Sequence, residues 1–201
     1  MLKAEKCKFD QMTIDFLGVV VGNGQVSMDP EKTKAVRKWR TPRNLKESRS
    51  FMQFCNYYRT FIPNFAAVTI PLNDLTRKDT PFVWGDRQQA AFDALKKAIA
   101  DNVVLTLPVP GAKFRVETDT SNYAVGGVLH QIIDGKARPL AFFSKTLLPE
   151  QRRYHVHDQE LLPIILTLQH FRHFLQNGPK FDIWTDHKNL QYFREPQKLN
   201  G

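Results

Sequence analysis

The sequence has 201 residues and a mass of 23.3 kDa, and its 42% hydrophobic and 24% charged residues are typical of a globular protein with a buried core. No apolar run reaches the ~18 residues of a membrane span, and the N-terminus lacks a signal-peptide pattern. The two cysteines, Cys7 and Cys55, are too few for a disulfide framework, so we expect an intracellular protein, in a cytoplasmic particle or the nucleus. The net charge of +9 indicates a polyanionic partner, although many basic proteins bind none.

The positive charge is concentrated in one stretch. Residues 32–59 contain nine basic residues and one acid, a net charge of +8. Such a run is either a solvated helix surface or a surface that follows phosphates, because clustered cations gain free energy by releasing counterions. The bases that we consider as nucleic-acid ligands are Lys32, Lys34, Arg37, Lys38, Arg40, Arg43, Lys46 and Arg49.

The first half begins with a hairpin and continues as helices. Residues 16–28 form two apolar runs around a glycine-rich turn, the pattern of a β-hairpin. Asp29 followed by proline predicts the start of a helix that reaches about Trp39. Asn44 caps a second predicted helix over residues 45–59, where apolar residues recur at steps of three and four. The aromatic residues of this region are expected in the core.

Prolines and glycines divide the rest of the chain. Pro63 and Pro71 bound a short aromatic-rich segment, and Asp86 is expected to cap a helix that reaches Ile99. Residues 107–111 contain two prolines and a glycine, which mark a boundary between a helical half and a strand-rich half.

The second half is predicted to be a mixed α/β arrangement, so the fold class of the whole chain is α+β. An antiparallel meander of three strands precedes a long helix, and one more strand and a short helix follow. The predicted ranges are strands 113–119, 123–133 and 138–144, helix 156–175, strand 180–185 and helix 187–194.

Three acids stand where this fold can bring them together. Asp119 ends the first strand of the second half and Asp186 the last; a helical crossover favours parallel strands with both acids at one sheet edge. Glu160 lies at the border of the apolar stripe of the intervening helix. Carboxylates bind hard divalent cations, and two Mg²⁺ ions ~3.5–4 Å apart can activate water for phosphodiester hydrolysis. The alternatives are an Asx turn at Asp119, a helix N-cap at Asp186 and a first-turn acid at Glu160.

Histidine pairs are a weaker signal for a metal. The chain contains His155-x-His157 and His170-x-x-His173. Zinc is disfavoured, because neither a clustered cysteine pair nor a His-Glu-x-x-His arrangement accompanies them.

Short motifs in order along the chain resemble the reverse transcriptase and ribonuclease H (RNase H) of Ty3/gypsy-type retrotransposons. In the first half they are Phe16-Leu17-Gly18, Asp29-Pro30-Glu31-Lys32, Tyr58-Arg59-Thr60-Phe61-Ile62-Pro63-Asn64-Phe65 and Pro71-Leu72-Asn73-Asp74-Leu75-Thr76. In the second half they are Glu117-Thr118-Asp119-Thr120-Ser121, Ala141-Phe142-Phe143-Ser144, Asp158-x-Glu160-Leu161-Leu162 and Thr185-Asp186-His187-Lys188-Asn189-Leu190. The resemblance covers essentially the whole chain in the order of the family.

The resemblance implies four regions. Residues 1–28 would end the polymerase palm, with Phe16, Leu17 and Gly18 in a hairpin that holds the primer strand. Residues 29–75 would be the helical thumb, with the basic stretch facing a duplex, and residues 76–111 a tether. Residues 112–201 would be an RNase H-like domain that is incomplete at its C-terminus.

The resemblance also implies a ligand and partners. Asp119, Glu160 and Asp186 match three acids that hold two Mg²⁺ ions, or Mn²⁺, while water cleaves the RNA strand of an RNA–DNA hybrid. The partners would be hybrid or duplex nucleic acid and the remainder of the polyprotein, with no membrane.

Three departures from the family pattern qualify this expectation. The Tyr-x-Asp-Asp motif of the palm is absent, so we expect no nucleotide addition by this chain. The fourth acidic ligand of the family would fall beyond Gly201, and Pro163 stands where the family has a small helix former. We therefore expect weak or no cleavage by this chain, and the alternative function is a non-catalytic nucleic-acid-binding remnant.

Overall fold

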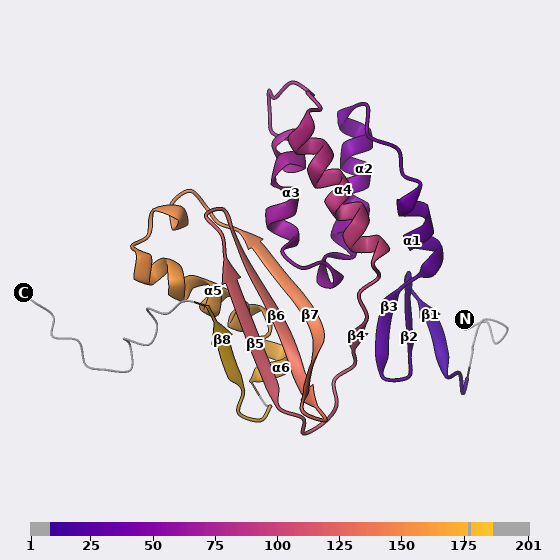
Figure 1. Ribbon diagram of the computed structural model, residues 1–201, viewed down its shortest axis with the longest axis vertical. Helices are drawn as coiled ribbons and strands as arrows, with labels where there is room; N and C mark the ends of the chain where they lie inside the picture. The colour runs from indigo at the N-terminus through magenta and orange to yellow at the C-terminus, as the bar shows by residue number, and fades with distance from the viewer. Residues whose placement is uncertain (1–8, 177, 187–201) are drawn as a thin grey trace, which may run out of the picture.

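The computed structural model describes residues 9–176 and 178–186, and the helix predicted over residues 187–194 lies outside them. A group of helices lies above one β-sheet, and a second sheet with its own helices lies beside them (Figure 1). No helix within the described ranges is long and apolar enough to cross a membrane. The architecture is a mixed α/β fold with two four-stranded sheets.

The first sheet is fully antiparallel, in the order β1-β2-β3-β4. Its strands are β1 (Thr13–Phe16), β2 (Val19–Gly22), β3 (Gln25–Met28) and β4 (Leu105–Thr106). β2 and β3 pair around a turn at Asn23 and Gly24, whose φ angles of 51° and 71° suit these two residue types. Our sequence reading missed β1 and β4, which extend the sheet on both sides of this hairpin.

The helical half contains four α-helices and one 3₁₀ turn among the described residues. These are α1 (Pro30–Arg37), α2 (Leu45–Tyr57), η2 (Arg59–Phe61), α3 (Phe65–Asp74) and α4 (Asp86–Ala100). The predicted caps are present, because Asp29 accepts from the Glu31 N–H at 2.8 Å and Asn44 accepts from the Glu47 N–H at 2.9 Å.

Several boundaries of the helical half differ from the prediction, and the first helix ends at Arg37 rather than at about Trp39. The second helix ends at Tyr57 rather than Arg59, which starts the separate turn η2. Pro71 does not end its segment but lies inside α3. Asp86 is the first residue of α4 rather than its cap, and the cap position is Gly85.

One hydrophobic core joins all four helices to the first sheet. Phe92, Leu95 and Ile99 of α4 are buried together with residues of α1, α2 and α3. Phe51, Tyr58, Phe61 and Phe65 are buried in this core as predicted, whereas Tyr57 is 56% exposed. The segment that the resemblance assigns to a tether thus supplies one of the principal core helices.

The second sheet has the order β7-β6-β5-β8, with β8 parallel to β5 and the other pairs antiparallel. Its strands are β5 (Phe114–Thr120), β6 (Ala124–Ile133), β7 (Lys136–Thr146) and β8 (Asp182–Thr185). The parallel pairing confirms the expectation from the helical crossover. It places the C-terminal ends of β5 and β8 at the same edge of the sheet.

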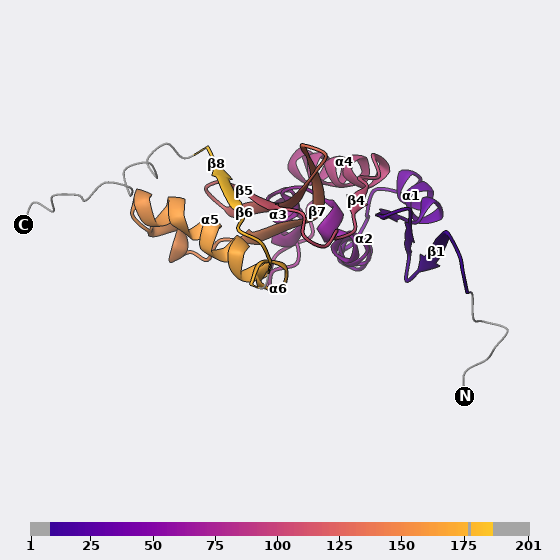
Figure 2. The same ribbon diagram turned by 90° about the horizontal axis from the view of Figure 1, so that it is seen from below.

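The predicted helix over residues 156–175 is divided. A 3₁₀ turn η3 (Gln151–Arg153) precedes α5 (Val156–His170), and α6 (Arg172–Leu175) follows after a break at the buried Phe171. Pro163 is buried within α5, and the helix continues through it. α5 and α6 lie on one face of the second sheet (Figure 2).

The two halves meet where η2 and α3 pack on the opposite face of the second sheet, against β6 and β7. The Arg59 guanidinium donates to the Ser144 carbonyl oxygen at 2.7 Å, and the Ala66 N–H donates to Ser144 Oγ at 2.9 Å. Asn64 occupies the cap position of α3, but its side chain makes no capping hydrogen bond. A hydroxyl from the other half of the chain therefore replaces it as a cap.

We predict that Ser144→Ala lowers the free energy of unfolding by about 1–3 kcal/mol, because the buried Ala66 N–H loses its acceptor. Urea denaturation measures the change. Ser50→Ala on the exposed side of α2 is the matched control and should have little effect. Equal stabilities of Ser144→Ala and the unmodified protein would contradict the capping role.

Candidate functional site

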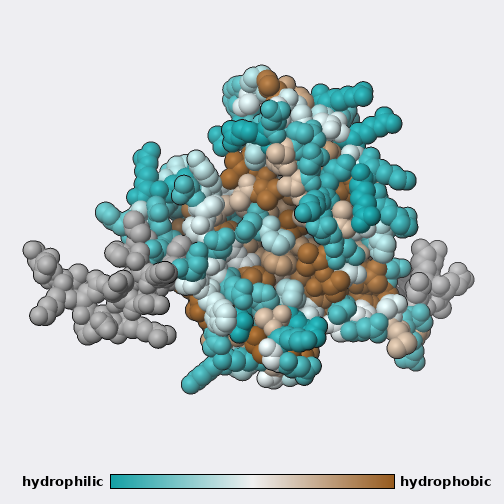
Figure 3. All heavy atoms as spheres, viewed as in Figure 1, coloured by the Kyte–Doolittle hydropathy of each residue, from teal (hydrophilic) through white to brown (hydrophobic). Residues whose placement is uncertain are grey.

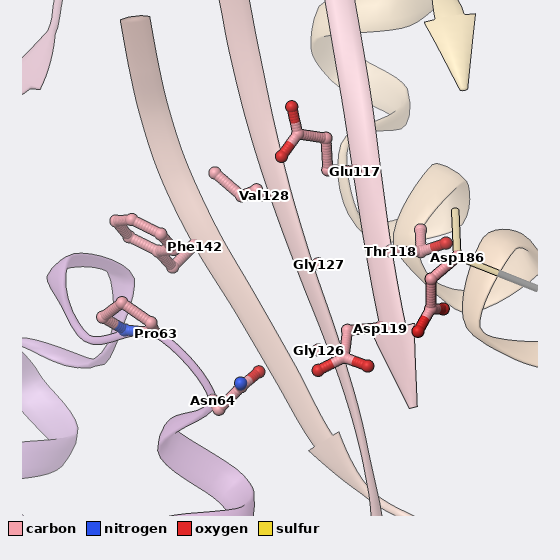
Figure 4. Close-up of a pocket in the computed structure, with 10 residues that line it drawn as sticks. All are labelled: Pro63, Asn64, Glu117, Thr118, Asp119, Gly126, Gly127, Val128, Phe142 and Asp186. Atoms are coloured by element: carbon pink, nitrogen blue, oxygen red, sulfur yellow. The ribbon is translucent and has the colours of Figure 1, made fainter. Parts of the chain in front are cut away.

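A pocket of about 350 Å³ lies at the ends of β5 and β8, between the second sheet and the start of α3 (Figure 4). Two of the three acids predicted from the sequence, Asp119 and Asp186, line it. The other lining residues are Pro63, Asn64, Glu117, Thr118, Gly126, Gly127, Val128 and Phe142. We call this cavity the carboxylate pocket.

The parallel pairing of β5 with β8 brings Asp119 and Asp186 together. Thr118 is the register partner of Thr185, so each acid comes one residue later at the same end of the sheet. Equivalent residues on neighbouring parallel strands point to the same face, with strand axes ~4.8 Å apart. Both acids are exposed, and their carboxylates point toward the same space (Figure 4).

The third acid, Glu160, lies in a different place. It is only 7% exposed and lines a neighbouring pocket of about 260 Å³ with Thr120, Ser121 and Arg152, among others. Within residues 9–176 and 178–186, no three or more His, Cys, Asp or Glu side chains are grouped to hold a metal ion. The structure thus brings two of the three predicted acids together and leaves Glu160 in the adjacent pocket.

The alternative roles of these acids can be compared with the structure. The alternative at Asp119 is an Asx turn; at the turn that follows it, the side-chain contact is made by Ser121, whose hydroxyl accepts from the Ala124 N–H at 3.1 Å. Glu160 is the fifth residue of α5 and is not a first-turn acid; Asp158 holds that position. A helix capped by Asp186 would lie outside the described residues.

The donor atoms of the carboxylate pocket suit a hard divalent cation. Asp119 and Asp186 offer carboxylate oxygens from adjacent strands, the ligand type preferred by Mg²⁺ and Mn²⁺. Of the three predicted acids, these are the two that could hold such an ion together.

The sequence reading missed the contribution of Asn64. This residue has left-handed backbone angles (φ 50°, ψ 29°), and its side chain points toward Gly126 and Asp119 (Figure 4). A Cβ at Gly126 would collide with the Asn64 amide oxygen, and a Cβ at Gly127 would lie 2.6 Å from the Thr167 side chain. The two glycines therefore allow α3 and α5 to approach opposite faces of β6, and no local sequence signal reveals this contact.

A second cluster missed by the sequence reading extends along the same face of the sheet. His130 Nδ1 lies 3.6 Å from Glu117 Oε1, and the Arg115 guanidinium lies 3.9 Å from the same oxygen. Arg115 also stacks over the ring of Trp184 at 3.7 Å, and that ring is 52% exposed. Burial lowers the pKa of His130 more than the Glu117 carboxylate raises it, and Arg115 lowers it further.

The eight bases named from the sequence are all exposed, on α1, on α2 and on the connection between them. A hydrophilic edge covers this part of the molecule (Figure 3). Lys34 is paired with Glu31 at 2.8 Å, and Arg37 donates to the Ala100 carbonyl oxygen at 2.9 Å. The charge of Lys34 is therefore partly neutralised by the Glu31 carboxylate.

Phe16 ends β1, and Leu17 and Gly18 form the turn that leads to β2. Phe16 is 59% and Leu17 72% exposed, and the φ angles of Leu17 and Gly18 are 48° and 81°. Tyr57 Oη donates to the Leu17 carbonyl oxygen, and Tyr58 Oη donates to the Gly18 carbonyl oxygen at 2.9 Å. Two tyrosines at the C-terminal end of α2, Tyr57 in the helix and Tyr58 at its cap, thus hold an apolar turn in an unusual backbone conformation.

Comparison with known proteins identifies relatives of the chain. Residues 84–183 match the family described as the RNase H-like domain found in reverse transcriptase. The Transposon Tf2-3 and Tf2-4 polyproteins of Schizosaccharomyces pombe (strain 972) are each 36% identical over 192 residues, which is 94% of this chain. The chain spans only 14% of the length of these polyproteins.

Solved structures share the fold. A foamy viral protease–reverse transcriptase in complex with dsDNA gives a TM-score of 0.76 at 18% identity, over 95% of this chain and 40% of that chain. The foamy viral enzyme in complex with an RNA/DNA hybrid gives 0.74 at 18% identity, over 94% of this chain and 26% of that chain. The family resemblance found in the sequence is confirmed.

The histidine environment predicts a pH dependence of stability. Burial lowers the pKa values of His130 and His170 below the ordinary 6.5. Below about pH 6.5 the unfolded chain therefore binds more protons at these residues than the folded chain, and stability falls as the pH falls.

Urea denaturation between pH 7.5 and 5.5 tests this expectation. His130→Gln should lose less stability over that interval than the unmodified protein, and NMR titration should find the His130 midpoint below 6.5. A midpoint above 6.5 would mean that Glu117 outweighs burial.

Proposed function

Because this chain belongs to the reverse transcriptase–RNase H region of Ty3/gypsy-type retrotransposon polyproteins, we propose that it binds RNA–DNA hybrid or duplex nucleic acid within such a polyprotein. The observation that carries the proposal is the run of exposed bases on α1, on α2 and between them. The meeting of Asp119 and Asp186 in one pocket of the second sheet supports hydrolysis of the RNA strand by the whole protein. Relatives of the same fold form complexes with dsDNA and with RNA/DNA hybrid, which supports the class of ligand.

The helical half supplies the binding surface in this proposal and acts as the thumb of the polymerase. Its exposed bases on α1 and α2 would follow the phosphates of the duplex, because each phosphate that they neutralise releases condensed counterions. The exposed turn at Phe16, Leu17 and Gly18 would contact the primer strand. The tyrosines that hold its carbonyl groups support a fixed position for it.

The strand-rich half supplies the chemistry in the whole protein. Asp119 and Asp186 would hold Mg²⁺ or Mn²⁺, which supplies the charge stabilisation for attack of water on the RNA phosphodiester. The two carboxylates also disfavour a bare phosphate in the pocket, so the charge of the strand must be compensated there. Glu160 would have to reach this pocket from the neighbouring one to complete the trio.

A non-catalytic nucleic-acid-binding remnant is the second candidate function. The observation that favours it is the separation of Glu160 from Asp119 and Asp186 in two pockets. Both candidates share the basic surface, and hydrolysis of the RNA strand distinguishes them.

The basic surface predicts salt-sensitive binding. Arg37→Gln, Lys38→Gln and Arg40→Gln together remove three exposed charges from the end of α1 and the residues that follow it. Each lost phosphate contact reduces the slope of log K against log salt by about 0.9, so the triple variant should reduce it by about 2 to 3. Fluorescence anisotropy with a labelled duplex over a series of salt concentrations measures both slopes.

The control removes the same charge from the strand-rich half. Lys136, Arg172 and Lys180 are exposed near the β6–β7 turn, at α6 and before β8, far from α1 in Figure 1. Their replacement by glutamine should leave the slope nearly unchanged. If both triple variants reduced the slope equally, the assignment of binding to α1 and α2 would fail.

The separation of Glu160 from Asp119 and Asp186 predicts slow hydrolysis of the RNA strand. We expect the chain to cleave the RNA strand of a hybrid slowly or not at all in Mg²⁺, and faster in Mn²⁺. Any cleavage should fall to the metal-free background in Asp119→Asn, whereas Asp134→Asn in the exposed β6–β7 turn should leave it unchanged. Gel analysis of an end-labelled RNA strand measures the rate; rapid Mg²⁺-dependent cleavage would show that the separation of Glu160 does not limit the reaction.

A further inference from the structure

A larger pocket, of about 490 Å³, lies where the end of α3 and the start of α4 meet the edge of the second sheet. Its lining includes Arg77, Arg87 and Arg152, and Asp74 is the one acid among the described residues that line it. The carboxylate pocket has the opposite composition, because its described lining residues include three acids and no base. We call this second cavity the arginine pocket.

Two of the three arginine charges in this pocket are not compensated. Arg77 pairs with Asp74 at 2.8 Å. Within the ranges 9–176 and 178–186, neither Arg87 nor Arg152 forms an ion pair with a carboxylate. The arginine pocket therefore attracts an anion, and most strongly one that carries two negative charges.

Contacts with its own half of the chain hold Arg152 in place. Its Nε donates to the Leu147 carbonyl oxygen at 3.1 Å, and its guanidinium lies 5.1 Å from the centre of the Tyr123 ring. Among the described residues, no acceptor is bonded to its terminal nitrogens, which carry four of the five N–H donors of a guanidinium. A side chain held in this way loses less conformational entropy when it binds an anion than a freely rotating one.

The donor groups of the arginine pocket suit a phosphate monoester. A guanidinium presents a planar pair of donors that matches two phosphate oxygens. A phosphate monoester carries a charge of about −1.5 to −2 at pH 7, which matches the two uncompensated arginines. The ring of Tyr123 is 54% exposed at the same pocket and offers a surface on which an adjoining base can stack.

The position of the pocket favours a nucleic-acid strand as the source of this phosphate. Both β5 and β7 run antiparallel to β6, so Asp119 near the end of β5 and Thr146 at the end of β7 lie at the same edge of the sheet. Thr146 lines the arginine pocket, and two strand spacings separate β5 from β7 by about 10 Å. A strand bound at the carboxylate pocket therefore has its neighbouring phosphates within reach of the arginine pocket.

We propose that the arginine pocket binds a terminal phosphate monoester of a nucleic-acid strand, with Arg87 and Arg152 as its ligands. Hydrolysis of a phosphodiester leaves a monoester at one of the two new ends, so a cleaved strand carries the group that this pocket fits. The inference rests on the proposed binding of nucleic acid. It adds a preference for phosphorylated strand ends, which is separate from the phosphate contacts of α1 and α2.

The test compares three hybrids in the full chain: the RNA strand carries a 5′-phosphate, a 3′-phosphate or hydroxyl groups at both ends. Fluorescence anisotropy in EDTA, with the label on the DNA strand, gives the affinities without dependence on cleavage. The unmodified chain should bind one of the phosphorylated hybrids about tenfold more tightly than the unphosphorylated hybrid. Arg87→Gln and Arg152→Gln should each reduce this ratio by about threefold or more and leave the affinity for the unphosphorylated hybrid nearly unchanged.

Arg153→Gln is the matched control, because Arg153 is an exposed neighbour of Arg152 that does not line the arginine pocket. It should leave the ratio unchanged. Thermal unfolding reports any loss of stability in Arg152→Gln, which also removes the contact with the Leu147 carbonyl oxygen. The Arg87 side chain is exposed and makes no hydrogen bond within the described residues, so Arg87→Gln tests the pocket without that effect.

The outcomes separate this inference from the proposed function. Equal affinities of the unmodified chain for the three hybrids would overturn the inference and leave nucleic-acid binding intact. An equal loss of the ratio in Arg153→Gln would also overturn it, because the preference would then come from general charge. A phosphoserine peptide that displaces the phosphorylated hybrid at equal concentration would assign the pocket to a phosphoprotein instead. Absence of binding to all three hybrids would contradict the proposed function itself, and the inference with it.

Discussion

The interface between α3 and the second sheet depends on the buried hydroxyl of Ser144. The start of α3 has backbone N–H groups without helical partners, and burying one of them without an acceptor is costly. Ser144 Oγ accepts from the Ala66 N–H, and the Ser144 carbonyl oxygen accepts from Arg59. One residue of β7 thus satisfies donors from two elements of the other half and fixes where the halves meet.

This contact also explains the form of the carboxylate pocket. Because Ser144 caps α3, Asn64 is released from that role and its side chain crosses Gly126. The pocket then combines acids from the ends of β5 and β8 with residues of the helical half. The helical half and the acids of the second sheet are therefore joined by a packed, hydrogen-bonded interface.

Local signals in the sequence predicted much of the fold and part of the site. The caps at Asp29 and Asn44, the β2–β3 turn and the parallel placement of β8 follow from residue types and chain order, and the structure contains them. The strands β1 and β4 were not predicted, because short strands at a sheet edge show little hydrophobic periodicity. The helix break at Phe171 was not predicted, because the apolar pattern continues through both α5 and α6. The roles of Ser144 and Asn64 could not be predicted because their contacts join distant parts of the chain: Ser144 is bonded to Ala66 and Arg59, 78 and 85 residues away, and Asn64 lies against Gly126.

The position of Glu160 shows where local prediction reaches its limit. Helical periodicity correctly placed Glu160 on α5, near the edge of the sheet. The cavity that it faces depends on how α5 packs on β5 and β6, where Gly127 admits Thr167 at close range. The same glycine pair sets the approach of α3 on the other face through Gly126. Gly126 and Gly127 thus determine how closely α3 and α5 approach the two faces of β6. The approach of α5 in turn sets the position of Glu160 relative to Asp119 and Asp186.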